Sequence, residues 1–95
     1  MKRYKVVLGY RDEKGDLAYK VSSVRGEVFE LDDRLFVHYR KKQARLVDIK
    51  SGYMIMERDS LDQVMRDWIA IYRVKYNQYI QTPRYKEICR TLEAK

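Results

Sequence analysis

Apolar and polar residues alternate along the first part of the chain, and the period then changes to that of a helix. Between Tyr4 and Glu57, short alternating runs are separated by turn-forming residues about every eight to twelve positions. Consecutive strands with short connections pair sequentially, so this spacing predicts an antiparallel sheet of about five to six short strands over residues 4–57. The first two runs, Tyr4–Arg11 and Leu17–Val24, flank a polar tract with a glycine and predict a β-hairpin.

The later runs of this part predict the rest of the sheet. Arg25-Gly26 is interpreted as a break in the alternation, and Ser51-Gly52 as a two-residue turn. Three strands are expected between these two features, and one is expected after the second feature. The four ranges are Glu27–Leu31, Arg34–Arg40, Arg45–Ile49 and Tyr53–Glu57.

From Ser60 to Gln81, apolar residues recur every three or four positions, which is typical of an amphipathic α-helix. Ser60 and Gln63 have the spacing of a capping box, and Thr82-Pro83 ends the helix because proline cannot continue it. The expected apolar side comprises Leu61, Met65, Trp68, Tyr72, Tyr76 and Tyr79, widened by Val64, Ile69 and Ile71; the polar side comprises Asp62, Arg66, Ala70, Arg73 and Asn77. We expect this one long helix, residues 60–81, to cover the apolar face of the sheet.

Residues 83–93 predict a short C-terminal helix. Thr82 suits the cap position and Pro83 the first helical position. An apolar stripe follows at helical spacing: Tyr85, Ile88, Cys89 and Leu92. No linker or repeat interrupts the chain, so we expect residues 1–95 to form a single α+β domain.

The charge balance of the chain indicates which kind of partner it would bind. Lys and Arg total 21 against 14 Asp and Glu, which gives a net charge of +7 and a pI near 9.6. This excess favours nucleic acid, acidic proteins or anionic surfaces, although a soluble basic protein has the same balance. The chain has one cysteine and no apolar run long enough to span a membrane, so we expect a cytoplasmic protein without a leader.

Cations concentrate where the fourth and fifth expected strands meet. Tyr39, Arg40, Lys41, Lys42 and Arg45 fall at this predicted hairpin tip. A two-stranded ribbon fits the major groove of DNA, where Arg and Lys contact phosphates or guanine edges. The tip is therefore the main candidate binding site. The alternative interpretation is that these charges keep a sheet edge from pairing with another sheet.

Two further groups are candidates for binding. Arg66 and Arg73 share the polar side of the long helix and would suit an acidic surface, although solvated cations are ordinary there. Tyr10, Tyr19 and Tyr39 alternate on the expected strands, where they would stack on unpaired bases or contact a protein.

The residues that usually carry catalysis occur singly in this chain. His38 has no neighbouring ligand with the spacing of a zinc site, and Cys89 lies on an apolar stripe. The glycines are scattered and match no phosphate-binding loop. We therefore expect no enzymatic activity, no cofactor and no metal.

The order strand, strand, strand, helix from Leu35 to Tyr79 resembles the small DNA-binding modules of some integrases. In those modules the sheet enters the groove and the helix backs it. Small, basic, tyrosine-rich proteins of this kind also resemble accessory products of phages and mobile elements, some of which inhibit host defence systems such as RNA-guided nucleases.

Two functions follow from these patterns. The first is a non-catalytic module that docks on nucleic acid or a nucleoprotein complex through the Arg40 to Arg45 ribbon. The alternative is a protein inhibitor of the anti-CRISPR type, or an assembly subunit, that acts through a basic, tyrosine-rich face. A homodimer is compatible with both functions.

Overall fold

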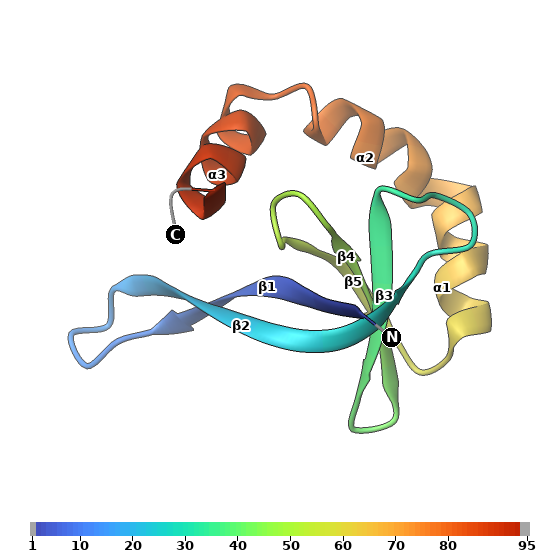
Figure 1. Ribbon diagram of the computed structural model, residues 1–95, viewed down its shortest axis with the longest axis horizontal. Coiled ribbons are helices and arrows are strands. Elements are labelled where there is room, and N and C mark those ends of the chain that lie inside the picture. Colours follow the sequence, from blue (N-terminus) through green and yellow to red (C-terminus); the bar gives the residue numbers. More distant parts are fainter. Residues whose placement is uncertain (1, 94–95) are drawn as a thin grey trace.

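The structure, a computed structural model, describes residues 2–93, without the side chains of residues 8–10, 17 and 91–93. An antiparallel sheet of five strands, paired in chain order, carries a helical layer, as Figure 1 shows. The strands are β1 (Lys2–Arg11), β2 (Leu17–Val28), β3 (Leu35–Arg40), β4 (Gln43–Asp48) and β5 (Met54–Arg58). The helical segments are α1 (Leu61–Asp67), the π-helical turn η1 (Trp68–Tyr72), α2 (Arg73–Tyr79) and α3 (Pro83–Glu93). The predicted α+β fold is confirmed.

β2 is one long strand that changes partner near its end. The predicted break at Arg25-Gly26, with a separate strand at Glu27–Leu31, is therefore wrong. Most of β2 pairs with β1, and only its last residues pair with β3. A Cβ at Gly26 would lie 2.8 Å from Cδ2 of Phe36 and 2.9 Å from the carbonyl oxygen of Val37. Glycine is thus required because the backbones approach closely where β2 meets β3.

Both faces of the β3–β4 pair are covered. Leu35 and Val37 point into a core beneath the helices, whereas Phe36 points to the opposite face. The core on the helical side contains Phe29, Leu35, Val37, Ala44, Leu46, Met56, Val64, Trp68 and Tyr76. The smaller core on the other side contains Val6, Phe36 and Val47, with Tyr4, Val24, Ile49 and Met54 packed against it.

The β1–β2 hairpin covers the second face because β1 curls back towards the turn between β4 and β5. The Val7 amide donates to the Gly52 carbonyl at 2.7 Å, and the Tyr4 ring stacks on Phe36 with centroids 4.4 Å apart. Gly52 has a φ of 71°, so the predicted Ser51-Gly52 turn depends on glycine. Beyond these contacts, the hairpin extends from the sheet as a twisted ribbon (Figure 1).

The predicted long helix forms, with a π-helical turn at its centre. The Ser60 hydroxyl accepts from the Gln63 amide at 3.2 Å, as the predicted cap requires. Val64, Trp68 and Tyr76 are all buried. Twelve residues of regular α-helix would place Tyr76 about 120° around the axis from Val64. The wider π turn keeps both on the buried side and brings the rings of Trp68 and Tyr76 to 5.5 Å.

The predicted burial of Ile69 and Ile71 is wrong. These side chains are 57% and 49% exposed, and Val74 beyond them is 61% exposed. In a π turn each residue advances by a smaller angle, so Ile71 does not come round to the buried side. The outer side of the helical layer therefore carries an apolar surface between the predicted cations.

The rest of the helical layer follows the predictions. The Thr82 hydroxyl accepts from the Tyr85 amide at 3.2 Å and caps α3, on which Tyr85 and Cys89 are buried. Leu92, predicted for the same stripe, lies outside the described side chains. Across the part of the chain that the structure describes, every helix is too short or too polar to cross a bilayer.

Candidate nucleic-acid interface

A pocket of about 420 Å³ opens where β2 separates from β3, and we call it the fork pocket. Its walls come from β1 and β2 on one side and from β3 and β4 on the other. The lining residues are Arg3, Val6, Ser22, Ser23, Val24, Arg25, His38, Tyr39, Arg40 and Arg45.

The fork opens because each of the two strands follows a different partner. β2 and β3 pair at Glu27↔Val37 and Val28↔Phe36. Beyond that ladder β2 continues against β1, and β3 continues against β4. The segments 22–25 and 38–40 consequently diverge, and residues of both segments border the gap. The sequence folds this way because the Gly26 contact holds the apex together.

The fork pocket is strongly basic. Four arginines and no acidic residue line it. Of these four arginines, only Arg45 forms an ion pair within the described part of the chain, with the Glu57 carboxylate directly opposite on β5. Arg3 faces Arg25 across the β1–β2 ladder, and like charges so placed repel by roughly 0.2–1 kcal/mol. An anion in the pocket would relieve this repulsion.

His38 forms part of the pocket wall and is only 4% exposed. Its Nε2 atom has no hydrogen-bond partner among the described residues. Burial lowers the pKa of His38 from its ordinary value, and the charges of Arg45 and Arg40 lower it further, partly offset by Glu57. The imidazole is therefore neutral near pH 7 in the free protein.

The predicted hairpin tip is the edge of this pocket. Tyr39, Arg40 and Arg45 line it, and Tyr39 is 61% exposed. Lys41 and Lys42 form the two-residue turn between Arg40 and Gln43 and are exposed. In Figure 1 this turn lies at the end of the sheet furthest from α2 and α3. The five residues predicted at the tip are thus brought together.

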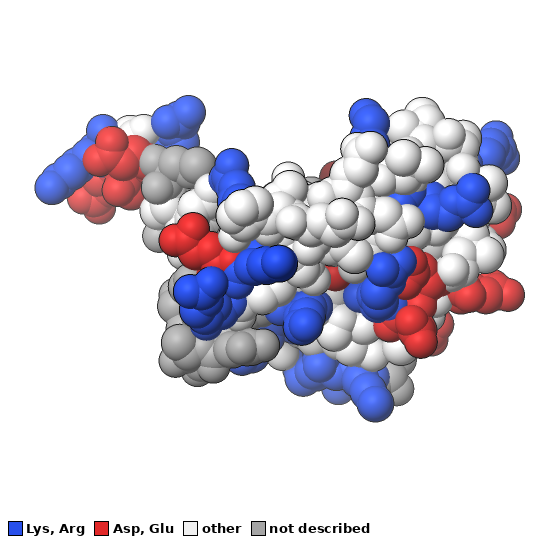
Figure 2. All heavy atoms as spheres, turned by 90° about the horizontal axis from the view of Figure 1, so that it is seen from above, with Lys and Arg blue, Asp and Glu red and all other residues white. Residues whose placement is uncertain are grey.

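Arg66 and Arg73 do not join this cluster. Both are exposed on the helical layer, whereas His38 and Arg45 belong to the opposite face of the sheet. Figure 2 shows the molecule from the helical side, where blue side chains are dispersed among white and red ones. These two predicted cations therefore belong to a separate surface.

Sequence reasoning missed Arg3 and Arg25, which lie far from the tip in the chain. The hairpin register contained the necessary information, because pairing outward from the turn at Asp12–Asp16 places Arg3 opposite Arg25. It did not reveal that both approach Arg40, since that depends on where β2 leaves β3. Of the predicted tyrosine platform, Tyr19 is 56% exposed and Tyr10 lies outside the described side chains.

The Lys41-Lys42 turn has an unusual backbone. Both residues have positive φ, 50° and 70°, as the central residues of a two-residue hairpin turn of type I′ do. Asn and Gly normally occupy these positions, because other residues cost about 1–2 kcal/mol in the left-handed region. Two lysines in this conformation place positive charge at the expense of stability, and such strain clusters at functional sites.

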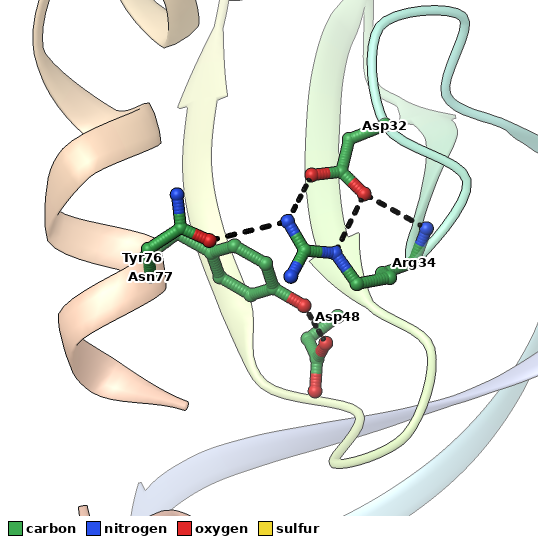
Figure 3. A network of polar contacts seen from close by, with 5 residues as sticks. All are labelled: Asp32, Arg34, Asp48, Tyr76 and Asn77. Atoms are coloured by element: carbon green, nitrogen blue, oxygen red, sulfur yellow. Dashed lines mark hydrogen bonds and ion pairs between the residues drawn. The ribbon is translucent and has the colours of Figure 1, made fainter. Parts of the chain in front are cut away.

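The opposite end of the β3–β4 pair contains a second polar cluster, drawn in Figure 3. Asp48 is 1% exposed. One carboxylate oxygen accepts from the Tyr76 hydroxyl at 2.6 Å. The other accepts from the amide and the hydroxyl of Ser51 at 2.9 and 2.6 Å. Burial, reinforced by the hydrogen bond to Asp48, raises the pKa of Tyr76.

Arg34 extends this cluster towards the surface. Its guanidinium forms two bonds with the Asp32 carboxylate, at 2.9 and 2.6 Å, and one with the Asn77 side chain at 3.2 Å. It also lies 5.0 Å from the centre of the Tyr76 ring. The bonds from Arg34 lower the pKa of Asp32. Every charged group in this cluster has a partner, so it joins α2 to the sheet and is not available to a ligand.

The tip of the β1–β2 hairpin is charged in a different way. Its surface pocket is lined by Arg11, Asp12, Glu13, Lys14 and Asp16. Asp12 accepts from the amides of Lys14 and Asp16, both at 2.9 Å, as turn aspartates commonly do. Figure 2 shows red and blue side chains intermixed on this protruding ribbon. This surface therefore carries charges of both signs, whereas the charged residues that line the fork pocket are all basic.

The donors that line the fork pocket suit an anion. Arginine binds phosphate with paired hydrogen bonds, and serine hydroxyls beside it add donors. Within the described residues, no three His, Cys, Asp or Glu side chains come together to hold a metal. Comparison with protein families, curated proteins and solved structures found no match to this chain.

Proposed function

We propose that this protein is a non-catalytic binding module that docks on nucleic acid, alone or within a nucleoprotein complex. The binding surface is the fork pocket together with the adjoining Lys41-Lys42 turn. One observation carries the proposal: Arg3, Arg25 and Arg40 surround a single pocket whose lining has no acidic residue. Their charges are unpaired within the described part of the chain.

The arrangement suits a phosphate backbone. Cations gathered at the pocket and at the adjoining turn contact phosphates, which supply a large share of the affinity of nucleic-acid binding proteins. Tyr39 beside them is exposed and offers an aromatic face to an unpaired base. The strained Lys41-Lys42 turn adds two cations at the pocket edge.

The test is affinity for single-stranded and duplex oligonucleotides measured by fluorescence anisotropy over a salt series. Five cations contribute if Arg3, Arg25, Arg40, Lys41 and Lys42 all reach phosphates. Counterion release then gives a slope of log affinity against log salt of about −3.5 on a single strand or −4.5 on a duplex. Absence of binding at low salt, or a slope near zero, contradicts the proposal.

A charge-matched pair of variants localises the effect. Arg25→Gln with Arg40→Gln removes two cations from the fork pocket, and the slope should become shallower by about 1.4 to 1.8. Lys14→Gln with Lys86→Gln removes two exposed cations elsewhere and should leave the slope unchanged. Equal losses in both variants would show that net charge, and not the fork pocket, determines binding.

A second candidate function rests on the helical layer. Ile69, Ile71 and Val74 are exposed beside Arg66 and Arg73, and such a surface is complementary to an acidic protein with apolar side chains. This function predicts a complex of defined stoichiometry that survives nuclease treatment. Ile71→Ser with Val74→Ser should abolish the complex, whereas the fork variant should retain it. This candidate is contradicted if the Ile71→Ser, Val74→Ser variant retains the complex and the fork variant loses it. It is also contradicted if the protein associates only with itself.

A further inference from the structure

We propose that the fork pocket binds the end of a nucleic-acid strand, with the terminal phosphate monoester on its arginines. This inference rests on the proposed function and specifies the part of the ligand that enters the pocket. It follows from the closed apex of the fork, from the charge of the walls and from the size of the pocket.

The fork is closed at one end. Beyond the paired residues of β2 and β3, the Phe29 amide donates to the Leu35 carbonyl at 2.9 Å and continues the closure. Val6 and His38, 1% and 4% exposed, form the buried part of the wall. A strand that enters the fork towards its apex therefore cannot continue past the paired residues, which favours a terminal group over an internal phosphodiester at that position.

The charge of the walls suits a monoester. A terminal phosphate carries about −1.5 to −2 at pH 7, whereas an internal phosphodiester carries a single charge. Arg45 is already paired with Glu57, which leaves Arg3, Arg25 and Arg40 for the ligand. The hydroxyl of Ser22, which lies opposite Val6 in the β1–β2 ladder, adds a donor for the free oxygens of a monoester. An internal phosphate would leave part of this donor set unused.

The pocket is larger than a phosphate. At about 420 Å³ it lies in the range of about 300–1,000 Å³ typical of small-molecule sites. Tyr39 borders the pocket and is 61% exposed, so it is accessible to the sugar or base that follows the phosphate. The ligand is therefore a terminal nucleotide and not a phosphate group alone.

His38 provides a local reporter. Arg40 and Arg45 disfavour the imidazolium form, and Glu57 favours it. A dianion between the arginines would screen them and favour protonation. The imidazole resonances of His38 should therefore titrate at higher pH when the pocket is occupied, which a purely structural role of the histidine would not produce.

The experiment compares one single-stranded oligonucleotide in three forms, with a 5′-phosphate, a 3′-phosphate or neither. We expect one phosphorylated form to bind at least about tenfold more tightly than the unphosphorylated form, as one added charge-assisted hydrogen bond provides. The advantage should disappear in Arg25→Gln with Arg40→Gln and persist in Lys14→Gln with Lys86→Gln. If the double fork variant does not fold, Arg25→Gln alone replaces it, because Arg25 is exposed.

The outcomes separate the two proposals. Equal affinity of the three forms, with a normal salt slope, overturns the terminal-phosphate inference and leaves the proposed function standing. Absence of binding to any form overturns both. Competition resolves the ligand further: a nucleoside monophosphate should displace the phosphorylated strand at concentrations where inorganic phosphate does not. Equal displacement by inorganic phosphate contradicts recognition of the nucleotide.

Discussion

The β3–β4 pair has a buried polar residue at each end, and the surroundings of the two differ. At one end Asp48 accepts hydrogen bonds from Tyr76 and Ser51, at distances of 2.6–2.9 Å. At the other end His38 has an Nε2 atom without a partner, next to arginines whose charges it does not balance. Both carboxylate oxygens of Asp48 thus have partners, whereas Nε2 of His38 has none among the described residues.

This difference separates scaffold from binding surface. Buried polar groups in folded proteins are nearly always partnered, as Asp48 is, and such networks fix one arrangement of the elements. Charges that converge without partners store repulsion that a ligand can remove. Changes at the Asp48 end should therefore alter stability and leave binding intact, and removal of the arginine charges at the fork pocket should weaken binding with little loss of stability.

The largest expected effect is on the scaffold. Trp68→Ala removes a ring that is 2% exposed and packs edge-on against Phe29, so it should lower the free energy of unfolding by about 3–5 kcal/mol. Urea denaturation measures the loss. Ile71→Ala on the exposed side is the control, with a change within about 0.5 kcal/mol. A loss below about 1 kcal/mol for Trp68→Ala would show that the helical layer does not pack as described.

A smaller effect is expected within the Asp48 network. Tyr76→Phe retains the ring but removes the hydroxyl that donates to the buried carboxylate, which should cost about 1.5–3 kcal/mol. Oligonucleotide affinity, measured at a temperature where the variant is folded, should equal that of the wild type. Reduced affinity in the folded variant would mean that the two ends of β3–β4 are coupled.

Replacing the two lysines of the Lys41-Lys42 turn should raise the stability of the protein and weaken its binding to a single strand. Lys41→Asn with Lys42→Gly replaces two strained residues by the pair that type I′ turns prefer, and should raise stability by about 1–2 kcal/mol. The same change removes two cations and should make the salt slope of single-strand binding shallower by about 1.4. Lys41→Gln with Lys42→Gln, which keeps the strain, should reproduce only the loss of binding. Higher stability with unchanged affinity would show that the two lysines do not contact the nucleic acid.

The smallest effect is a pH dependence of stability due to His38. Its pKa in the folded protein lies below the unfolded value of 6.5, because burial and then Arg45 and Arg40 disfavour the charged form. Between the two pKa values the unfolded state binds more protons, so the free energy of unfolding falls as the pH decreases through about 6.5. Urea denaturation between about pH 7.5 and 5.5 should show a steeper fall for the wild type than for His38→Gln. Identical profiles would contradict the buried, neutral imidazole.

The sequence predicted those parts of the fold that depend on local chemistry. Ser60 and Thr82 cap the helices as expected. The π turn was not predictable from spacing alone, because the positions of Val64 and Tyr76 also fit the edge of an ordinary stripe. The continuity of β2 was missed because Arg25-Gly26 resembles a break, whereas Gly26 serves a contact with a strand distant in the chain.

The candidate site was only partly predictable for the same reason. Arg40 to Arg45 form a cluster in the sequence, and the two-residue turn keeps them together. Arg3 and Arg25 enter the pocket only through the pairing of β1 with β2 and the divergence of β2 from β3. Likewise Asp48 meets Tyr76, 28 positions later, only when α2 packs on the sheet. Tertiary contacts, and not local patterns, define both polar clusters.

The most direct test of the fork pocket is to map backbone amide shifts by NMR while a phosphorylated single strand is added. The largest shifts should fall on residues 22–25 and 38–43 and on Arg3, and the amides of Asp48, Ser51 and Tyr76 should hardly move. Shifts concentrated on α1, η1 and α2, with the two diverging strands unperturbed, would contradict a binding surface at the fork.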